Sequence, residues 1–149
     1  MAVRVLEVSS SKNLQLFDQF PGALYRGCFR PPTFPRPALS GEFSDPLFSR
    51  VVAQPFLALK NGYPAGRLVA CIHLAYPVEH TGFFGYFESI NDTSVASALL
   101  ESAGRWLAAE GRQKVIGPVD LSPHERLGLL VEGFNGQHLP GMPFNQSYY

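Results

Sequence analysis

The sequence has few charged residues and no excess of either sign. Asp, Glu, Lys and Arg make up 16% of the 149 residues, well below the usual quarter. Twelve basic residues balance twelve acidic ones. Without a net positive charge there is no basis for expecting nucleic acid or an anionic membrane as a partner. A neutral surface instead favours self-association.

Long apolar runs and cysteines are also scarce. No run reaches the roughly 18 residues of a membrane span, and the opening MAVRVLEVSSSK has no signal-peptide core. We therefore expect a cytoplasmic protein. Cys28 and Cys71 are too few for a disulfide framework and lie in no metal-like spacing, so we expect no metal. Cys71 is interpreted as a small buried residue.

The residues that are abundant are apolar, with 46% hydrophobic residues, 12 Phe and 13 Pro. This composition and length predict a single domain, 1–149, with its own core. Pro and Arg gather in the segment 28–46, which we interpret as an extended surface connection, with a Pro-rich recognition ligand as the alternative. Asp45-Pro46 suits the start of a short helix that includes Val51.

Periodicity predicts the secondary structure. The helices are expected at about 11–20, 22–26 (after a break at Pro21-Gly22), 92–110 and from Ser122 onward. The strands are expected at 2–8, 55–60, 67–76, 81–90 and 113–117. Asn61-Gly62 signals a hairpin, but Pro64 and Gly66 predict a loop longer than two residues.

The helix over 92–110 has the clearest pattern. Asp92, Thr93 or Ser94 can cap it, and a wide apolar stripe ending at Trp106 predicts that this tryptophan belongs to the core. A strand, a helix and a strand in succession predict a parallel crossover. The fold class is therefore α+β, an antiparallel meander extended by one parallel strand.

This order resembles the GNAT acetyltransferase superfamily. The segments PFLALKNGYPAGRLVACI, TGFFGYFES, VIGPVDLS, GLLVEGF and FNQSYY, taken in order, are similar to a bacterial group of GNAT-like proteins. The resemblance implies a GNAT-like mixed sheet with flanking helices. It also implies that the chain lacks the usual C-terminal helix and strand pair, and so is truncated.

The resemblance further implies acyl transfer from acetyl-CoA or another acyl-CoA to an amine of unknown identity. Glu88 and His124, the latter beside Glu125, are the candidate bases. The residues implied to hold the donor are Tyr86, Phe87, Ser89, Ile90, Thr93 and Ser94. The alternatives are structural: Glu88 as a cap of the following helix, and His124 as part of a helix start capped by Ser122.

One departure weakens the implied activity. GNAT enzymes bind the coenzyme A diphosphate on a glycine-rich loop at a helix N-terminus, whereas this chain reads ESINDTSVAS, with no glycine and with Asp92. We therefore expect weak binding of the donor. The alternative function is a non-catalytic module that binds a small molecule or assembles with itself.

The edge strand predicts an oligomer. Strand 113–117 would be left unpaired, and a second copy could pair with it in a homodimer or higher oligomer. The alternative is that the tail, Leu127 to Tyr149, folds back over this edge.

Overall fold

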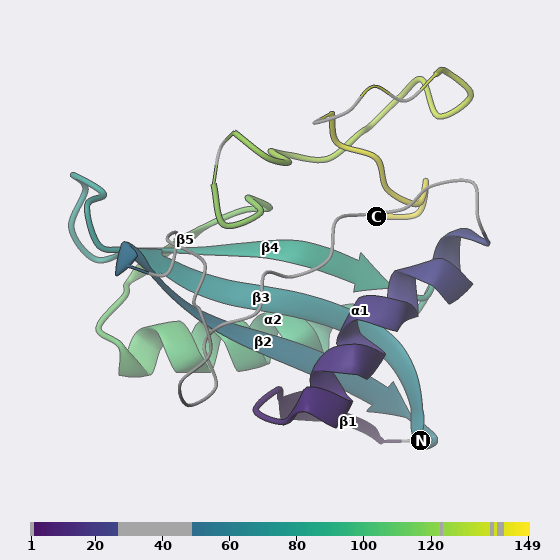
Figure 1. The fold of residues 1–149 in the computed structure, drawn as a ribbon, viewed down its shortest axis with the longest axis horizontal. Helices are drawn as coiled ribbons and strands as arrows, with labels where there is room; N and C mark the ends of the chain where they lie inside the picture. The colour runs from purple at the N-terminus through teal and green to yellow at the C-terminus, as the bar shows by residue number, and fades with distance from the viewer. Residues whose placement is uncertain (1, 27–48, 123, 138, 140–141) are drawn as a thin grey trace.

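The computed structural model describes residues 2–26, 49–122, 124–137, 139 and 142–149 (Figure 1). The segment 28–46 and the proposed start at Asp45-Pro46 lie outside the described residues. One five-stranded sheet has the order β1-β2-β3-β4-β5. Its strands are β1 (Val3–Glu7), β2 (Val51–Lys60), β3 (Tyr63–His73), β4 (Thr81–Ser89) and β5 (Lys114–Ile116).

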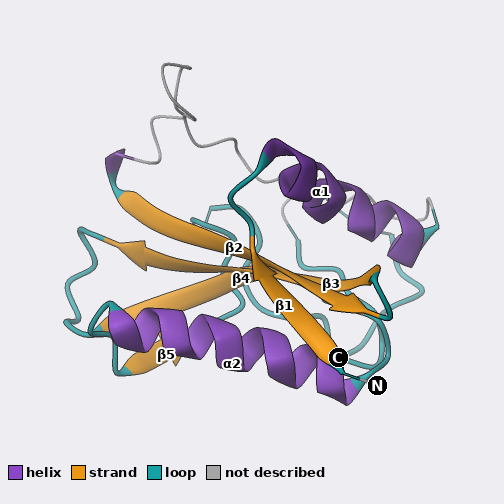
Figure 2. Ribbon diagram, turned by 90° about the horizontal axis from the view of Figure 1, so that it is seen from below, coloured by secondary structure: helices purple, strands orange, loops and turns teal. Residues whose placement is uncertain are grey.

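The sheet has the predicted topology. Strands β1 to β4 pair in antiparallel fashion, and β5 pairs parallel to β4. Helix α1 (Ser11–Tyr25) lies on one face and α2 (Thr93–Ala109) on the other (Figure 2). Each helix closes its own apolar cluster, with Phe17 buried on the α1 side and Leu99 on the α2 side. The expected α+β meander with one parallel strand is confirmed.

Helix α1 is continuous, so the predicted break at Pro21-Gly22 is wrong. Ser10 caps the start of the helix, accepting from the Asn13 amide at 3.2 Å. Pro21 lacks the amide that would bond the Phe17 carbonyl four residues earlier. That carbonyl instead accepts from Arg67 Nη1 at 3.3 Å. A side chain from β3 thus replaces the missing bond, which sequence-local reasoning could not reveal.

The hairpin between β2 and β3 has a two-residue turn, not the longer loop predicted. Lys60 pairs directly with Tyr63, and Asn61 and Gly62 both have positive φ, 54° and 83°. That backbone matches the strand twist. β3 continues through Pro64, and a register shift after Ala58 accommodates it. Val51, expected in a short helix, begins β2, and β3 ends before the expected residue 76.

Helix α2 begins as predicted, with Asp92 as its N-cap. Its buried residues are Val95, Leu99, Ser102, Ala103 and Leu107. Trp106 is only half-buried and packs at the margin of this cluster, so its expected place in the core is corrected. The adjacent Leu107 is the fully buried residue of that turn because it points at the sheet.

After β5 the chain continues beside β4 in the same direction, and it then folds back so that Leu127 pairs with Val119 (Figure 1). Within the described part of this tail there is no helix at Ser122, and the regular pairing is an isolated bridge between Val119 and Leu127. Among the described residues, no helix is long and apolar enough to cross a membrane.

Candidate functional site

Strands β4 and β5 stay together only over a short distance. Thr81–Phe83 pairs with Lys114–Ile116, and the Val119 amide then donates to the Phe84 carbonyl at 2.7 Å. At Gly85 the approach is so close that a Cβ would overlap the Val119 carbonyl. Beyond Gly85 the two segments separate.

A bulge in β4 accompanies the separation. Arg67 pairs with Glu88 and Val69 with Gly85, so two β4 residues stand opposite Leu68 alone. The first of them, Tyr86, has φ 51°, and its amide donates to Asp120 Oδ1 at 2.6 Å instead of to a strand. A carboxylate from the segment after β5 therefore satisfies the backbone where the strands part.

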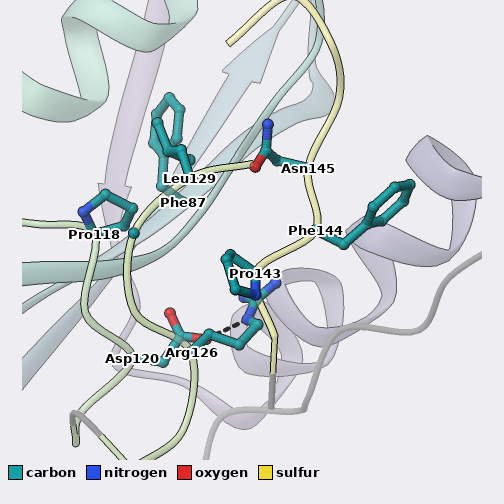
Figure 3. A pocket seen from close by; sticks show the side chains of 9 residues that line it. Phe87, Pro118, Asp120, Arg126, Leu129, Pro143, Phe144 and Asn145 are labelled. Atoms are coloured by element: carbon teal, nitrogen blue, oxygen red, sulfur yellow. Dashed lines mark hydrogen bonds and ion pairs between the residues drawn. The ribbon is translucent and has the colours of Figure 1, made fainter. Parts of the chain in front are cut away.

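The separated strands border a small pocket, here called the splay pocket, with a cavity volume of about 20 Å³ (Figure 3). Phe87 from β4 and Pro118 from the opposite segment line it, and the tail closes it. Its remaining lining residues are Asp120, Arg126, Gly128, Leu129, Pro143, Phe144 and Asn145. The pocket thus combines apolar walls with one carboxylate, one guanidinium and one amide.

A buried polar cluster lies beside this pocket and is centred on Glu88, which is 1% exposed. Glu88 Oε2 accepts from the Tyr25 hydroxyl at 2.5 Å and from the Tyr149 hydroxyl at 3.0 Å. Glu88 Oε1 accepts from Arg126 Nη1 at 3.4 Å. We call Tyr25, Arg67, Glu88, Arg126 and Tyr149 the Glu88 cluster.

Burial controls the protonation of this cluster. It raises the pKa of Glu88, although the hydrogen bond from Tyr25 and the charges of Arg67 and Arg126 oppose the shift. Burial and the Glu88 charge raise the pKa of Tyr25 and of Tyr149 far above the ordinary value of 10. Both hydroxyls therefore keep their protons, and the carboxyl is the member of the cluster suited to accept one.

Arg67 is wholly buried under α1. Its guanidinium carbon lies 5.0 Å from the centre of the Phe17 ring and 5.7 Å from that of Tyr86. Within the described residues its Nε and Nη2 atoms have no hydrogen-bond partner. Arg126 is better paired, because its Nε donates to Asp120 Oδ2 at 2.5 Å. Two guanidiniums and two carboxylates thus share a space largely closed to water.

The structure does not bring His124 into this cluster. Its side chain is exposed, and its amide donates to Ser122 Oγ at 3.2 Å. Glu125, expected to orient the imidazole, accepts instead from the Tyr86 hydroxyl at 3.3 Å. Glu88 is also not the cap of α2, since Asp92 takes that position.

The N-terminus of α2, where Thr93 and Ser94 were expected to hold the donor, is occupied by the chain itself. Asp92 Oδ1 accepts from the Ser94 amide at 2.9 Å and the Ser94 hydroxyl at 2.6 Å. Lys60 pairs with Asp92 Oδ2, and the bonds from Lys60 and Ser94 hold the pKa of Asp92 well below its usual range. This carboxylate does not fit a diphosphate at the same helix end.

The β4 residues expected to hold the donor are likewise mostly engaged. The Ser89 amide donates to the Tyr149 hydroxyl at 2.7 Å, and the Ser89 carbonyl accepts from Tyr148. The Ile90 amide donates to the Ala65 carbonyl at 2.9 Å. Of the six residues implied by the resemblance, Phe87 is the one that lines the splay pocket.

Sequence reasoning missed three members of the Glu88 cluster, Tyr25, Arg67 and Arg126, together with the contact of Tyr149 with Glu88. It also missed Asp120, which pairs with Arg126. The available signal was Arg67, the one charge in the apolar run RLVACIHLAY, since a buried charge needs partners. Among the described residues, no group of three or more His, Cys, Asp or Glu side chains is arranged to hold a metal.

Two curated proteins resemble the chain. Protein YghO of Escherichia coli K12 is 30% identical over 145 residues, which cover 94% of this chain and 37% of that protein. A bacterial ceramide synthase of Caulobacter vibrioides is 36% identical over 96 residues, 62% of this chain and 25% of that protein. The chain thus spans about a third and a quarter of their lengths. No protein-family model matches the chain.

Solved structures identify the fold. An aminoglycoside acetyltransferase from an uncultured soil sample superimposes with a TM-score of 0.55 at 12% identity, over 79% of this chain and 78% of that one. Two further acetyltransferase structures match at similar levels. The chain has the GNAT, or acyl-CoA N-acyltransferase-like, fold, as expected from its sequence motifs.

Proposed function

We propose that the chain is an acyl-CoA-dependent N-acyltransferase domain whose acceptor is a long-chain amine. The observation that carries this proposal is the splay pocket, which lies between β4 and the segment after β5 in a GNAT fold. In this proposal the thioester arm of an acyl donor enters between the two separated strands, where the splay pocket lies. The name of the Caulobacter relative, a bacterial ceramide synthase, supports the acceptor class, because a ceramide is the amide of a long-chain amino alcohol.

The reaction makes one bond and breaks one. The amine nitrogen attacks the thioester carbonyl, a C–N bond forms, the C–S bond breaks, and the proton lost by the nitrogen balances the one gained by the sulfur. Glu88 is the proton acceptor in this proposal. Neither Glu88 nor the hydroxyls of Tyr25 and Tyr149 that donate to it line the pocket, so a bridging water must carry the proton from the amine to this cluster. The guanidinium of Arg126, which does line the pocket, stabilises negative charge on the carbonyl oxygen.

The test is product formation. The 149-residue chain is incubated with octanoyl-CoA and dodecylamine, and the amide is measured by mass spectrometry. Glu88→Gln should lower kcat by about 10²-fold or more, the usual contribution of a general base. Glu101→Gln, at an exposed carboxylate on α2, is the matched control and should leave kcat unchanged. Absence of amide with any amine, or an unimpaired Glu88→Gln variant, would contradict the proposal.

A non-catalytic binding module is the second candidate. It is favoured by the closed N-terminus of α2, where Asp92 and Lys60 occupy the place of a diphosphate. It is also favoured by Tyr148 and Tyr149, because their hydroxyls hydrogen-bond to the Ser89 carbonyl and the Ser89 amide and leave neither group open to a donor. Binding of amine or donor in a calorimeter without any amide product would select this second function.

A further inference from the structure

A second, larger cavity lies on the α1 face of the sheet, at the end where β2 begins and β3 ends. We call it the apolar cleft; its cavity volume is about 480 Å³. Its floor is formed by the buried residues Val51, Phe83 and Leu121, and Tyr76 and Leu127 stand exposed at its rim. Figure 2 shows α1 lying over the other end of this face. The size and lining are those of a small-molecule site.

The apolar cleft and the splay pocket share a wall. Along the extended segment after β5, Pro118 and Asp120 line the splay pocket, whereas Val119 and Leu121 line the cleft. This is the alternation of an extended chain, whose successive side chains point to opposite sides. The segment 118–121 therefore presents alternate side chains to the splay pocket and to the apolar cleft.

The returning chain continues the same wall. Leu127 forms a bridge with Val119 and lines the cleft, whereas its neighbours Arg126 and Gly128 line the splay pocket. Arg126 and Leu127, neighbours in the sequence, therefore line different cavities on the two sides of this wall, one with polar groups and one apolar.

The polar groups of the cleft are few and suit an uncharged chain. The side chains concerned are those of Arg50, His73, Tyr76 and Ser122. Burial lowers the pKa of His73, so this imidazole is neutral at neutral pH. Its ring packs edge-on against Phe83 with centroids 4.9 Å apart. Of the described lining residues, Arg50 alone keeps a charge, and it is exposed.

We propose that the apolar cleft binds the long alkyl chain of a lipid substrate while the reacting group of the same molecule lies in the splay pocket. This inference rests on the proposed function and adds to it the place of the chain. The two sources of such a chain are the amine acceptor and the acyl donor, and separate arms of the test distinguish them.

The test measures binding, independently of turnover, with the 149-residue chain. Butylamine, octylamine and dodecylamine are titrated in a calorimeter, and acetyl-CoA is compared with octanoyl-CoA. Burial of each added methylene should raise the affinity by up to about fourfold. Ala75→Trp fills the cleft from its exposed rim and should abolish this dependence on chain length. Ala108→Trp, at an exposed alanine on α2, is the control and should retain it.

A second pair of variants guards against a folding defect. Leu127→Ser should lower the affinity for dodecylamine several-fold and leave the affinity for butylamine unchanged. Leu100→Ser, at a comparably exposed leucine on α2, should change neither affinity. Thermal unfolding by circular dichroism confirms that each variant is folded. Loss confined to the amine series assigns the chain to the acceptor, and loss confined to octanoyl-CoA assigns it to the donor.

Affinity that does not rise with chain length, or a series that survives Ala75→Trp, overturns the inference. The proposed function fails in a different way. If amides form from short and long amines at the same rate, acyl transfer stands and the cleft does not hold the chain. If no amide forms but the chain-length dependence is lost in Ala75→Trp, the cleft holds an alkyl chain and the acyltransferase proposal is wrong.

Discussion

Arg67 and Glu88 lie directly opposite each other on β3 and β4, and both are fully buried. Burial acts on them in opposite directions, lowering the pKa of Arg67 and raising that of Glu88, and each opposes the shift of the other by its charge. The two charges are therefore mutually dependent. A buried charge deprived of its counter-charge is far more costly than a missing surface pair.

The first prediction concerns this dependence. Glu88→Ala should lower the free energy of unfolding by about 3–5 kcal/mol, because it leaves Arg67 and Arg126 buried with less opposite charge. Glu88→Gln should cost less, since the amide oxygen still accepts from Tyr25. Urea denaturation measures both. Glu101→Ala, on the solvent face of α2, should be close to neutral; equal losses at positions 88 and 101 would contradict the buried cluster.

The second prediction concerns the separation of β4 and β5. Gly85→Ala places a Cβ against the Val119 carbonyl, which must move, and overpacking of this kind costs about 1–3 kcal/mol. Gly104→Ala, in α2, is a control of opposite sign. Nothing lies within 4 Å of a Cβ there, and alanine is favoured over glycine inside a helix by roughly 0.8–1.0 kcal/mol. The melting temperature should fall for Gly85→Ala and rise for Gly104→Ala. A Gly85→Ala variant more stable than the unaltered chain would refute the close approach of Gly85 to the Val119 carbonyl.

Much of the fold could be predicted because its signals are local. The alternating runs of β2 to β4, the α2 stripe and the Asp92 cap each depend on a few neighbouring residues. The continuity of α1 through Pro21 does not, because the carbonyl freed by Pro21 is satisfied by Arg67 from β3. A proline read on its own predicts a break.

The candidate site was less predictable for the same reason. Glu88 was identified from its motif, but its partners Tyr25 and Arg126 are 63 and 38 residues away in the chain. No spacing rule links such residues, and the fold alone brings them together. His124 is predicted as a base because Ser122 and Glu125 lie near it in the sequence. The side chains of adjacent residues point in different directions, so Glu125 accepts from the Tyr86 hydroxyl while the His124 side chain is exposed.

The third prediction concerns coenzyme A. Asp92 presents a carboxylate at the N-terminus of α2, so acetyl-CoA should bind with a dissociation constant well above the submicromolar range. Asp92→Ser keeps a capping oxygen and removes the charge, which should tighten binding by about twofold to fivefold. Glu110→Gln, just after the other end of α2, should have no effect. Calorimetric titration decides, and submicromolar binding by the unaltered chain would disprove the expectation.

The fourth prediction concerns acid. Burial lowers the pKa of His73 below its ordinary value of 6.5, so the unfolded chain takes up a proton more readily than the folded one. The stability due to this residue is therefore complete above about pH 6.5 and is lost as the pH falls below it. His73→Gln should reduce the loss of stability between about pH 7.5 and pH 5 in urea titrations. His80→Gln, at an exposed histidine, should not reduce it.

The last prediction concerns assembly. In the described structure β5 is the last strand of the sheet, and the tail runs beside β4 (Figure 1). Val115 in β5 is 45% exposed, and a neutral chain has little net repulsion between copies. We propose that two chains pair through this edge about a two-fold axis.

Light scattering after size-exclusion chromatography tests this assembly at micromolar concentration. The unaltered chain should have the mass of a dimer, and Val115→Lys should have that of a monomer, because a lysine on the edge strand disfavours pairing with another strand. Leu100→Lys introduces the same charge at an exposed leucine on α2 and should remain dimeric. A single-chain mass for the unaltered protein would mean that the edge stays unpaired, and a dimeric Val115→Lys would place the interface elsewhere than β5.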